Sequence, residues 1–327
     1  GRRGVRVLSV AAAKQTVGNP KREKGWLWKT FKKQKYLQMM VIPGIIFFII
    51  FSYIPMYGVL IAFKDYNFAD GILGSPWVGL KHFRDFFSEP ELFMMFRNTI
   101  GISVLKTLFG FPGPIIFAIL LNEIASNGYK RTIQTISYLP HFVSLVVVIG
   151  MVIRFSSANG GLFNDILVGL HIIDEPISFL AQPKYFWGIL IGINVWKGIG
   201  WGSIVYCSAI SGIDQALYEA ATIDGAGRFR RIWHVTLPGI MPMVTIYLIL
   251  TMASILTGSG FDDIFLLRND MLYKVSQTVS IYSYEMGLVK GSYSYSTAIG
   301  LFTSVINLTL LIISNTVSRK VSENSLW

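Results

Sequence analysis

The sequence predicts an all-α polytopic membrane protein with six transmembrane helices. Hydrophobic residues make up 52% of the 327 residues, and charged residues only 14%. A soluble domain carries about 25% charged residues, so most of this chain is expected to face lipid or neighbouring helices rather than water. A helix needs about 20 apolar residues to cross a bilayer. Six segments meet or approach that length: 37–63, 100–121, 136–153, 186–210, 241–257 and 297–313.

A basic tail, residues 1–36, precedes the first predicted span. It contains eleven lysine or arginine residues and a single acid, Glu23, and so supplies +10 of the formal net charge of +11. A basic block directly before an apolar run is typical of a cytoplasmic chain end and attracts anionic lipid headgroups. We therefore expect membrane lipid, and not nucleic acid, as the partner of this charge. The apolar run itself is too long for the core of a signal peptide.

The distribution of basic residues between the connecting segments predicts the orientation of the chain. If the N-terminus is cytoplasmic, the four inside segments carry twice as many lysine and arginine residues as the three outside segments. Most of this excess lies in the tail. The bias follows the positive-inside rule and predicts that both termini are cytoplasmic.

The chain is predicted to have no catalytic, metal or cofactor site of its own. Its one cysteine, Cys207, lies in an apolar run and is expected to be a small buried residue. The four histidines are scattered and give no spacing suited to zinc. The sequence has no G-x-x-x-x-G-K-[ST] loop, so we do not expect ATP to bind this chain through such a motif.

The segment 213–238 is too polar to cross the membrane and is predicted to form two short helices. Asp214 is expected to cap a helix over 215–223, and Gly225 fits the left-handed position that ends it. A second helix is expected over 226–234, before Pro238 marks the boundary of the next span. Ala220 and Ala221 leave a flat surface that another protein can approach.

Three parts of this segment resemble the EAA-type signature of the membrane subunits of binding-protein-dependent ABC importers: Glu219-Ala220-Ala221, Asp224-Gly225-Ala226 and Leu237-Pro238. Val235 stands where that family often has isoleucine, which is a mild departure. The resemblance extends over 96–313 and implies the five-helix core of type I ABC importers. A first transmembrane helix with an external loop, 37–95, would precede this core, and a cytoplasmic tail, 314–327, would follow it.

The resemblance implies that segment 213–238 forms cytoplasmic coupling helices held by a separate ATPase. The residues assigned to this coupling are Glu219, Ala220, Ala221, Asp224, Gly225, Arg228 and Pro238. A dimer of ATPase subunits would bind ATP and Mg²⁺. The other implied partners are a second homologous membrane subunit and an extracytoplasmic solute-binding protein, and the implied location is the bacterial plasma (inner) membrane.

The segment 258–265, which reads GSGFDDIF, resembles the carbohydrate branch of these importers. Its oligosaccharide and polysaccharide members are the most similar, the bacterial alginate importer among them. The resemblance therefore implies that the chain helps to import an oligosaccharide or polysaccharide, including acidic ones, after delivery by an external binding protein.

Two lysines, Lys106 and Lys197, lie inside predicted spans, where a charge costs at least ~3 kcal/mol on insertion scales. Asn194, Lys197 and Trp201 follow each other at helical spacing, so an amide, a cation and an aromatic surface lie near one face. Such groups bind sugars, and we assign these three residues to the substrate path. The alternative is that Lys197 extends to an interface and Trp201 anchors there. For Lys106, closer to a predicted helix end, this extended conformation is favoured.

Asp262 and Asp263 follow the fifth predicted span on the expected outer side. They are candidates for contact with the binding protein, and a solvated turn after Gly258 and Gly260 is an equal alternative. An ion-gradient-driven secondary transporter is the alternative function, and it requires a buried acidic relay that the predicted spans lack. A membrane-embedded enzyme would need a convergent catalytic set, which the sequence does not offer.

Overall fold

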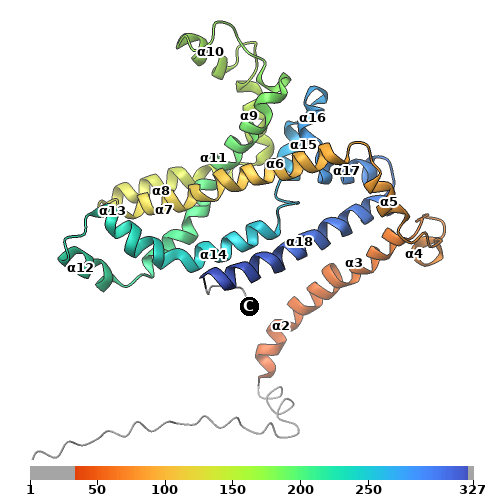
Figure 1. Cartoon of the computed structure of the whole chain (residues 1–327), viewed down its shortest axis with the longest axis horizontal. Helices are drawn as coiled ribbons and strands as arrows, with labels where there is room; N and C mark the ends of the chain where they lie inside the picture. Colours follow the sequence, from red (N-terminus) through yellow and green to blue (C-terminus); the bar gives the residue numbers. More distant parts are fainter. Residues whose placement is uncertain (1–33, 323–327) are drawn as a thin grey trace, which may run out of the picture. The chain divides into compact units, whose positions relative to one another are not determined.

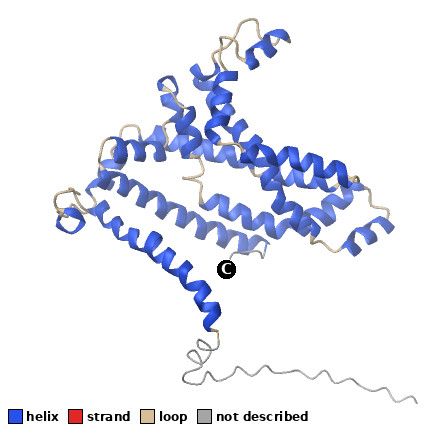
Figure 2. Ribbon diagram, turned by 180° about the vertical axis from the view of Figure 1, so that it is seen from behind, coloured by secondary structure: helices blue, strands red, loops and turns tan. Residues whose placement is uncertain are grey.

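The computed structural model describes residues 34–322. They form two compact units, the first ending at Tyr57 and the second beginning at Gly58. Figure 2 shows helices joined by loops throughout these residues, whose one strand-like feature is an isolated bridge between Lys64 and Trp77. The predicted all-α class is confirmed. Residues 1–33 of the predicted basic tail and residues 323–327 of the predicted C-terminal tail lie outside the described part of the chain.

The first unit contains one long apolar helix. It consists of α2 (Lys35–Phe48), the π-helical turn η1 (Ile49–Tyr53) and α3 (Ile54–Met56), and the apolar run continues into the second unit as η2 (Tyr57–Phe63). Together these 29 residues are long and apolar enough to cross a membrane, as predicted. The wide turn η1 ends two residues before Pro55. A proline ring crowds the preceding turn and removes one of its N–H donors, and a π-turn accommodates both effects.

The second unit holds the remaining helices. In chain order they are α4 (Gly71–Gly74), α5 (Lys81–Phe87), α6 (Leu92–Gly110), α7 (Pro112–Asn122), α8 (Asn127–Phe142), α9 (Leu145–Phe155), α10 (Leu162–Gly169), η3 (Phe179–Ala181), α11 (Pro183–Ser211), α12 (Gln215–Ile223), α13 (Arg228–Arg231), η4 (Ile232–Thr236), α14 (Leu237–Ala253), α15 (Phe261–Leu267), η5 (Asp270–Leu272), α16 (Tyr273–Ser276), α17 (Val279–Tyr284), η6 (Glu285–Val289) and α18 (Tyr293–Ser322).

Four stretches of this unit form continuous helices long enough to span: Leu92–Asn122, Pro183–Ser211, Arg228–Ala253 and Tyr293–Lys320. They correspond to the second, fourth, fifth and sixth predicted spans, and each is longer than the sequence indicated. The second begins eight residues earlier than predicted. Lys106 therefore lies at the middle of its span and not near an end.

The third predicted span, 136–153, is not one straight helix. Helices α8 and α9 meet at an angle of 93°, with Val143 and Ser144 extended between them. Pro140 lies in the last turn of α8, where it removes a backbone donor and favours the end of the helix. The predicted number of six crossings holds when this bent pair counts as one span.

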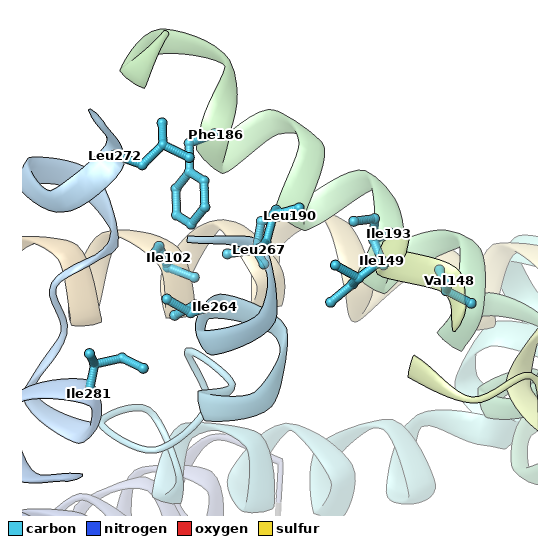
Figure 3. Packing of buried hydrophobic residues seen from close by; sticks show 10 residues of the cluster. All are labelled: Ile102, Val148, Ile149, Phe186, Leu190, Ile193, Ile264, Leu267, Leu272 and Ile281. Carbon is cyan, nitrogen blue, oxygen red and sulfur yellow. The ribbon is translucent and has the colours of Figure 1, made fainter. Parts of the chain in front are cut away.

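Helix α11 is the centre of the second unit and packs against α6, α7, α8 and α14, while α14 lies beside α18 (Figure 1). The main hydrophobic cluster joins helices that are distant in sequence (Figure 3). Its buried members are Ile102 of α6, Val148 and Ile149 of α9, Phe186, Leu190 and Ile193 of α11, Ile264 and Leu267 of α15, Leu272 of η5 and Ile281 of α17. This packing fixes the short helix α15 against α9 and α11.

Candidate functional site

The polar segment predicted to couple to another protein begins with helix α12. Its bounds, Gln215–Ile223, are those that the sequence predicts. The carboxylate of Asp214 accepts a hydrogen bond of 2.9 Å from the backbone N–H of Ala216, so the predicted N-cap is also confirmed.

The end of α12 is a Schellman motif centred on Gly225. The N–H of Ala226 donates to the carbonyl of Ala221 at 2.9 Å, and the N–H of Gly225 donates to that of Thr222 at 3.0 Å. Gly225 has a φ of 73°, a backbone conformation that a Cβ atom disfavours. The predicted left-handed position is therefore confirmed, and the glycine sets the direction in which the chain leaves α12.

The second predicted helix, 226–234, is corrected by the structure. Helix α13 starts at Arg228 and continues through η4 into α14, so that Arg228–Ala253 is one span of 26 residues. Pro238 is not a boundary. The π-turn η4 ends two residues before it, as η1 does before Pro55, and the wider turn accommodates the ring. Helix α13 is therefore the first part of the span and not a separate helix.

Polar contacts join α12 to the base of this span. The hydroxyl of Tyr218 lies 2.9 Å from the buried hydroxyl of Thr236, and the guanidinium of Arg231 donates to the hydroxyl of Thr222 at 3.2 Å. The base itself rests on a cluster that includes Ile210 of α11 and Ile240 of α14. The segment is thus held to the helix bundle, and not suspended as a loose loop.

The outer surface of the segment is open and partly apolar. Ile223 and Phe229 are 86% and 89% exposed, on the two sides of Gly225, and Trp233 is 67% exposed. Of the seven residues assigned to coupling, six are exposed and Ala221 is half-buried. Large apolar side chains exposed to this degree on a polar segment indicate a protein-binding surface. We call Leu217, Ile223, Phe229 and Trp233 the coupling patch.

A cavity of about 240 Å³ opens within the helix bundle, between α6, α7, α11 and α14. Asn194 of the predicted substrate path lines it, with its amide oxygen directed toward Gly110. Its other polar lining residues are Ser103, Lys106, Thr107, Tyr206, Tyr247, Thr251 and Ser254. Ligand sites commonly have volumes of about 300–1,000 Å³, so this cavity by itself is smaller than a common ligand site.

Lys106 borders the cavity and forms a buried ion pair. Its ammonium lies 2.5 Å from the carboxylate of Asp263, and the two side chains are only 8% and 16% exposed. The preference for an extended Lys106 at an interface was wrong, because the residue is central in its span. The two partners are separated by 157 residues in the sequence, so no spacing argument could have paired them.

Gly260 makes this pair possible. A Cβ atom on Gly260 would lie 2.6 Å from the Lys106 nitrogen and 2.8 Å from an Asp263 oxygen, and its φ is 80°. The backbone conformation favours glycine, and a Cβ atom here would displace the end of at least one of the two paired side chains. The GSGFDD part of the sugar-importer resemblance therefore has a physical reason, because it brings a carboxylate to the middle of a membrane span.

Lys197 and Trp201 do not line this cavity. The Lys197 ammonium donates to the carbonyls of Pro140, His141 and Val143, at 3.2, 3.4 and 2.5 Å. The Trp201 ring stacks on the ring of His141, with centroids 4.5 Å apart. Both side chains contact the corner between α8 and α9, where the helix break leaves carbonyls without helical partners. The three predicted path residues thus divide between the cavity and this corner.

Asp262 and Asp263 also separate. Asp262 is exposed, whereas Asp263 turns inward to Lys106. The structure therefore corrects the prediction that Asp263 faces a binding protein, and that role stays a prediction for Asp262 alone. Asp263 also brings a carboxylate to the level of the middle of the span Leu92–Asn122. The sequence had indicated no acidic residue within the spans, and this absence was the reason given against a secondary transporter. Asp263 is ion-paired, and within the described residues it belongs to no metal-binding group of acids, histidines or cysteines.

Comparison with known proteins decides between these functional classes. Residues 110–323 match the family model for the binding-protein-dependent transport system inner membrane component. The chain belongs to this family. The match covers the central helix α11, the coupling segment and the cavity lining from Gly110 onward, while Ser103, Lys106 and Thr107 precede it. A secondary transporter is accordingly not favoured.

Relatives of this family match nearly the whole chain. The protein LplB of Bacillus subtilis is 43% identical over 93% of this chain and 95% of its own length. The polygalacturonan/rhamnogalacturonan transport system permease protein YteP of Bacillus subtilis is 41% identical, over 90% and 91%. Among solved structures, a bacterial ABC transporter involved in the import of the acidic polysaccharide alginate has a chain with a TM-score of 0.83 and 40% identity, covering 90% of this chain and 99% of that one.

A second crystal structure shows a bacterial alginate ABC transporter in complex with a periplasmic protein that holds an alginate pentasaccharide. Its matching chain has a TM-score of 0.84 and 39% identity to the present chain, covering 92% and 99% of the two. The helices described above are thus those of a multi-pass inner-membrane transport subunit.

Proposed function

We propose that this chain is one transmembrane subunit of an ATP-driven importer for oligosaccharides or polysaccharides that contain acidic sugars. The observation that carries the proposal is similarity at about 40% identity, over nine-tenths of the chain, to proteins named for polygalacturonan/rhamnogalacturonan transport and for alginate import. A lysine that borders the central cavity supports it, because an ammonium group binds carboxylates.

The proposed complex contains a second homologous membrane subunit, a dimer of ATPase subunits that binds ATP and Mg²⁺, and an external solute-binding protein. The small volume of the cavity beside Lys106 supports the second subunit, which would complete the path. The exposed coupling patch supports the ATPase. Six crossings would leave both ends of the chain on the same side of the membrane, and we assign that side to the cytoplasm because of the basic tail.

The proposed mechanism is alternating access. Closure of the ATPase pair on ATP displaces α12 and α13. Because α13 is continuous with the span Arg228–Ala253, this displacement tilts a membrane helix beside the cavity. ATP binding can drive the change only if the ATPase pair binds nucleotide more tightly in one of the two states.

Uptake by a reconstituted complex tests the proposal. Proteoliposomes with the complete importer should accumulate oligogalacturonate or alginate oligosaccharides when ATP and the loaded binding protein are supplied. Glu219→Lys or Gly225→Asp should abolish this uptake. Glu123→Lys reverses a charge at the C-terminal end of α7, outside the coupling segment, and should leave uptake intact.

Two results would count against the proposal. ATP-independent accumulation of the sugar would exclude an ATPase motor. Normal uptake by both coupling variants would exclude segment 213–238 as the lever.

A further inference from the structure

The ion pair between Lys106 and Asp263 lies in an unusual place for a structural element. Lys106 is at the middle of the span Leu92–Asn122, and its side chain borders the cavity. A buried ion pair contributes little stability compared with an apolar pair of the same volume, because both charges lose their hydration. Stability alone therefore does not explain why two charges meet here.

The surroundings of the pair contain an unused hydrogen-bonding group. Ser103 lies one helical turn before Lys106, is 1% exposed and lines the same cavity. Its hydroxyl has no hydrogen-bond partner. Leaving a buried hydroxyl without a hydrogen-bond partner costs folding free energy. The Ser103 hydroxyl lines the same cavity as the Lys106 ammonium, so both can bind oxygen atoms of a ligand there. Asn194 lines the same space from α11.

We propose that Lys106 is the residue that binds the substrate's carboxylate in the translocation path, and that Asp263 takes the place of that carboxylate when the path is empty. A uronate group entering the cavity displaces Asp263 from the ammonium of Lys106, and Asp263 returns when the sugar leaves. This inference rests on the proposed import of acidic sugars and names the residue that selects them.

The position of Asp263 suits this exchange. It lies in the first turn of the short helix α15, three residues after the N-cap residue Gly260. The hydrophobic side of α15, Ile264 and Leu267, is packed in the main cluster (Figure 3), so the helix itself need not move. A rotation of the Asp263 side chain is enough to free Lys106, with the charge balance kept by the incoming carboxylate.

The exchange also explains selectivity. A neutral sugar cannot replace Asp263, because removing the aspartate would leave Lys106 as an unpaired buried charge. Neutral sugars are then disfavoured in two ways: they would leave Lys106 unpaired, and they lack the carboxylate that the ammonium attracts.

Two single variants separate this role from a structural one. In proteoliposomes containing the complete importer, uptake is measured for an oligogalacturonate and for its methyl ester, each at saturating occupancy of the binding protein. Lys106→Gln should reduce uptake of the acid about tenfold or more, and of the ester less than about twofold. Asp263→Asn leaves Lys106 without its internal partner, so the KM for the acid should fall while the maximal rate also falls through slow release.

A structural pair predicts a different pattern. Both variants break the pair, so both would then reduce uptake of the acid and of the ester to the same extent. This result would overturn the proposal. Unchanged uptake of the acid by Lys106→Gln would overturn it as well.

A double variant guards against misfolding. Lys106→Met with Asp263→Leu replaces the whole pair by apolar groups, which buried pairs commonly tolerate. It should keep the thermal stability of the wild type and still show the reduced uptake of the acid that is expected for Lys106→Gln. Normal uptake of the acid by a folded double variant would refute the assignment. Arg268→Gln is the matched control, because it breaks the ion pair with Glu285 (2.7 Å), which does not line the cavity.

Uptake by the wild-type complex separates the proposed import of acidic sugars from the proposed role of Lys106. If the wild-type complex imports only neutral sugars, the proposed function fails and this inference with it. If the wild type imports the acid and the acid-to-ester ratio is the same in every variant, only the inference fails.

Discussion

Phe229 provides a direct test of the coupling patch, because its contribution to folding and its contribution to docking can be separated. The side chain is 89% exposed, so truncation to alanine removes almost no packing from the chain itself. Full burial of a phenylalanine side chain is worth about 1.5–3 kcal/mol. If a groove of the ATPase covers it, Phe229→Ala should raise the dissociation constant of the ATPase subunit about 10- to 150-fold.

The measurement is a titration of the permease pair, held in nanodiscs, with a fluorescently labelled ATPase subunit. The matched control is Phe93→Ala. Phe93 is 80% exposed but lies at the start of α6, at the other end of that span from the α7 residues that pack beside the coupling segment. Equal affinities for wild type and Phe229→Ala would refute the argument. An equal loss in both variants would show a general effect of surface hydrophobicity.

Three further outcomes follow from the geometry. Gly225→Ala places a Cβ at a φ of 73° and should destabilise the α12–α13 corner by about 1–2 kcal/mol, seen as weaker ATPase stimulation; Gly225→Asn should be milder, because asparagine tolerates that conformation. Lys197→Met removes the donor to three carbonyls and should lower the free energy of unfolding in detergent by about 1.5–3 kcal/mol, with the preference between acidic and neutral sugars unchanged. Partial burial, together with the hydrogen bond to Glu91, raises the pKa of Tyr273 above its usual 10.0, and the resulting stabilisation is fully present below pH 10 and is lost as the pH rises through the folded-state pKa. Part of the phenolate absorbance of the native protein should therefore appear at higher pH than in the denatured chain, and Tyr273→Phe should reduce this difference by the contribution of one tyrosine.

The helices were predictable where local chemistry determines them. The cap at Asp214, the bounds of α12 and the left-handed Gly225 depend on residues within one or two turns, and the structure confirms each. The spans at 37–63 and 186–210 follow from apolar length alone. Pro238 misled the prediction, because a proline ends a helix only where the backbone cannot adapt. Here the π-turn η4 absorbs the ring and the helix continues.

The parts of the site that were not predictable depend on contacts between distant segments. Nothing around Pro140 indicates that α9 leaves α8 at 93°, because the direction is set by packing against α11 and α15. Ser103 could not be recognised either, since serines are common in membrane helices and its lack of a partner is a property of the folded bundle. The unusual glycine spacing in 258–260 was the one local signal, and its meaning required the position of Lys106.

The two lysines within the spans show that a charge with a high insertion free energy marks a position of interest but does not reveal its role. Both carry the same charge in spans of similar length, and a hydropathy argument treats them alike. Lys197 donates to backbone carbonyls that the helix break has exposed, and no acidic partner lies beside it among residues 34–322. Lys106 meets a carboxylate that another carboxylate can replace. Lys106 also borders the cavity, which Lys197 does not, so we place substrate selection at Lys106 and fold maintenance at Lys197.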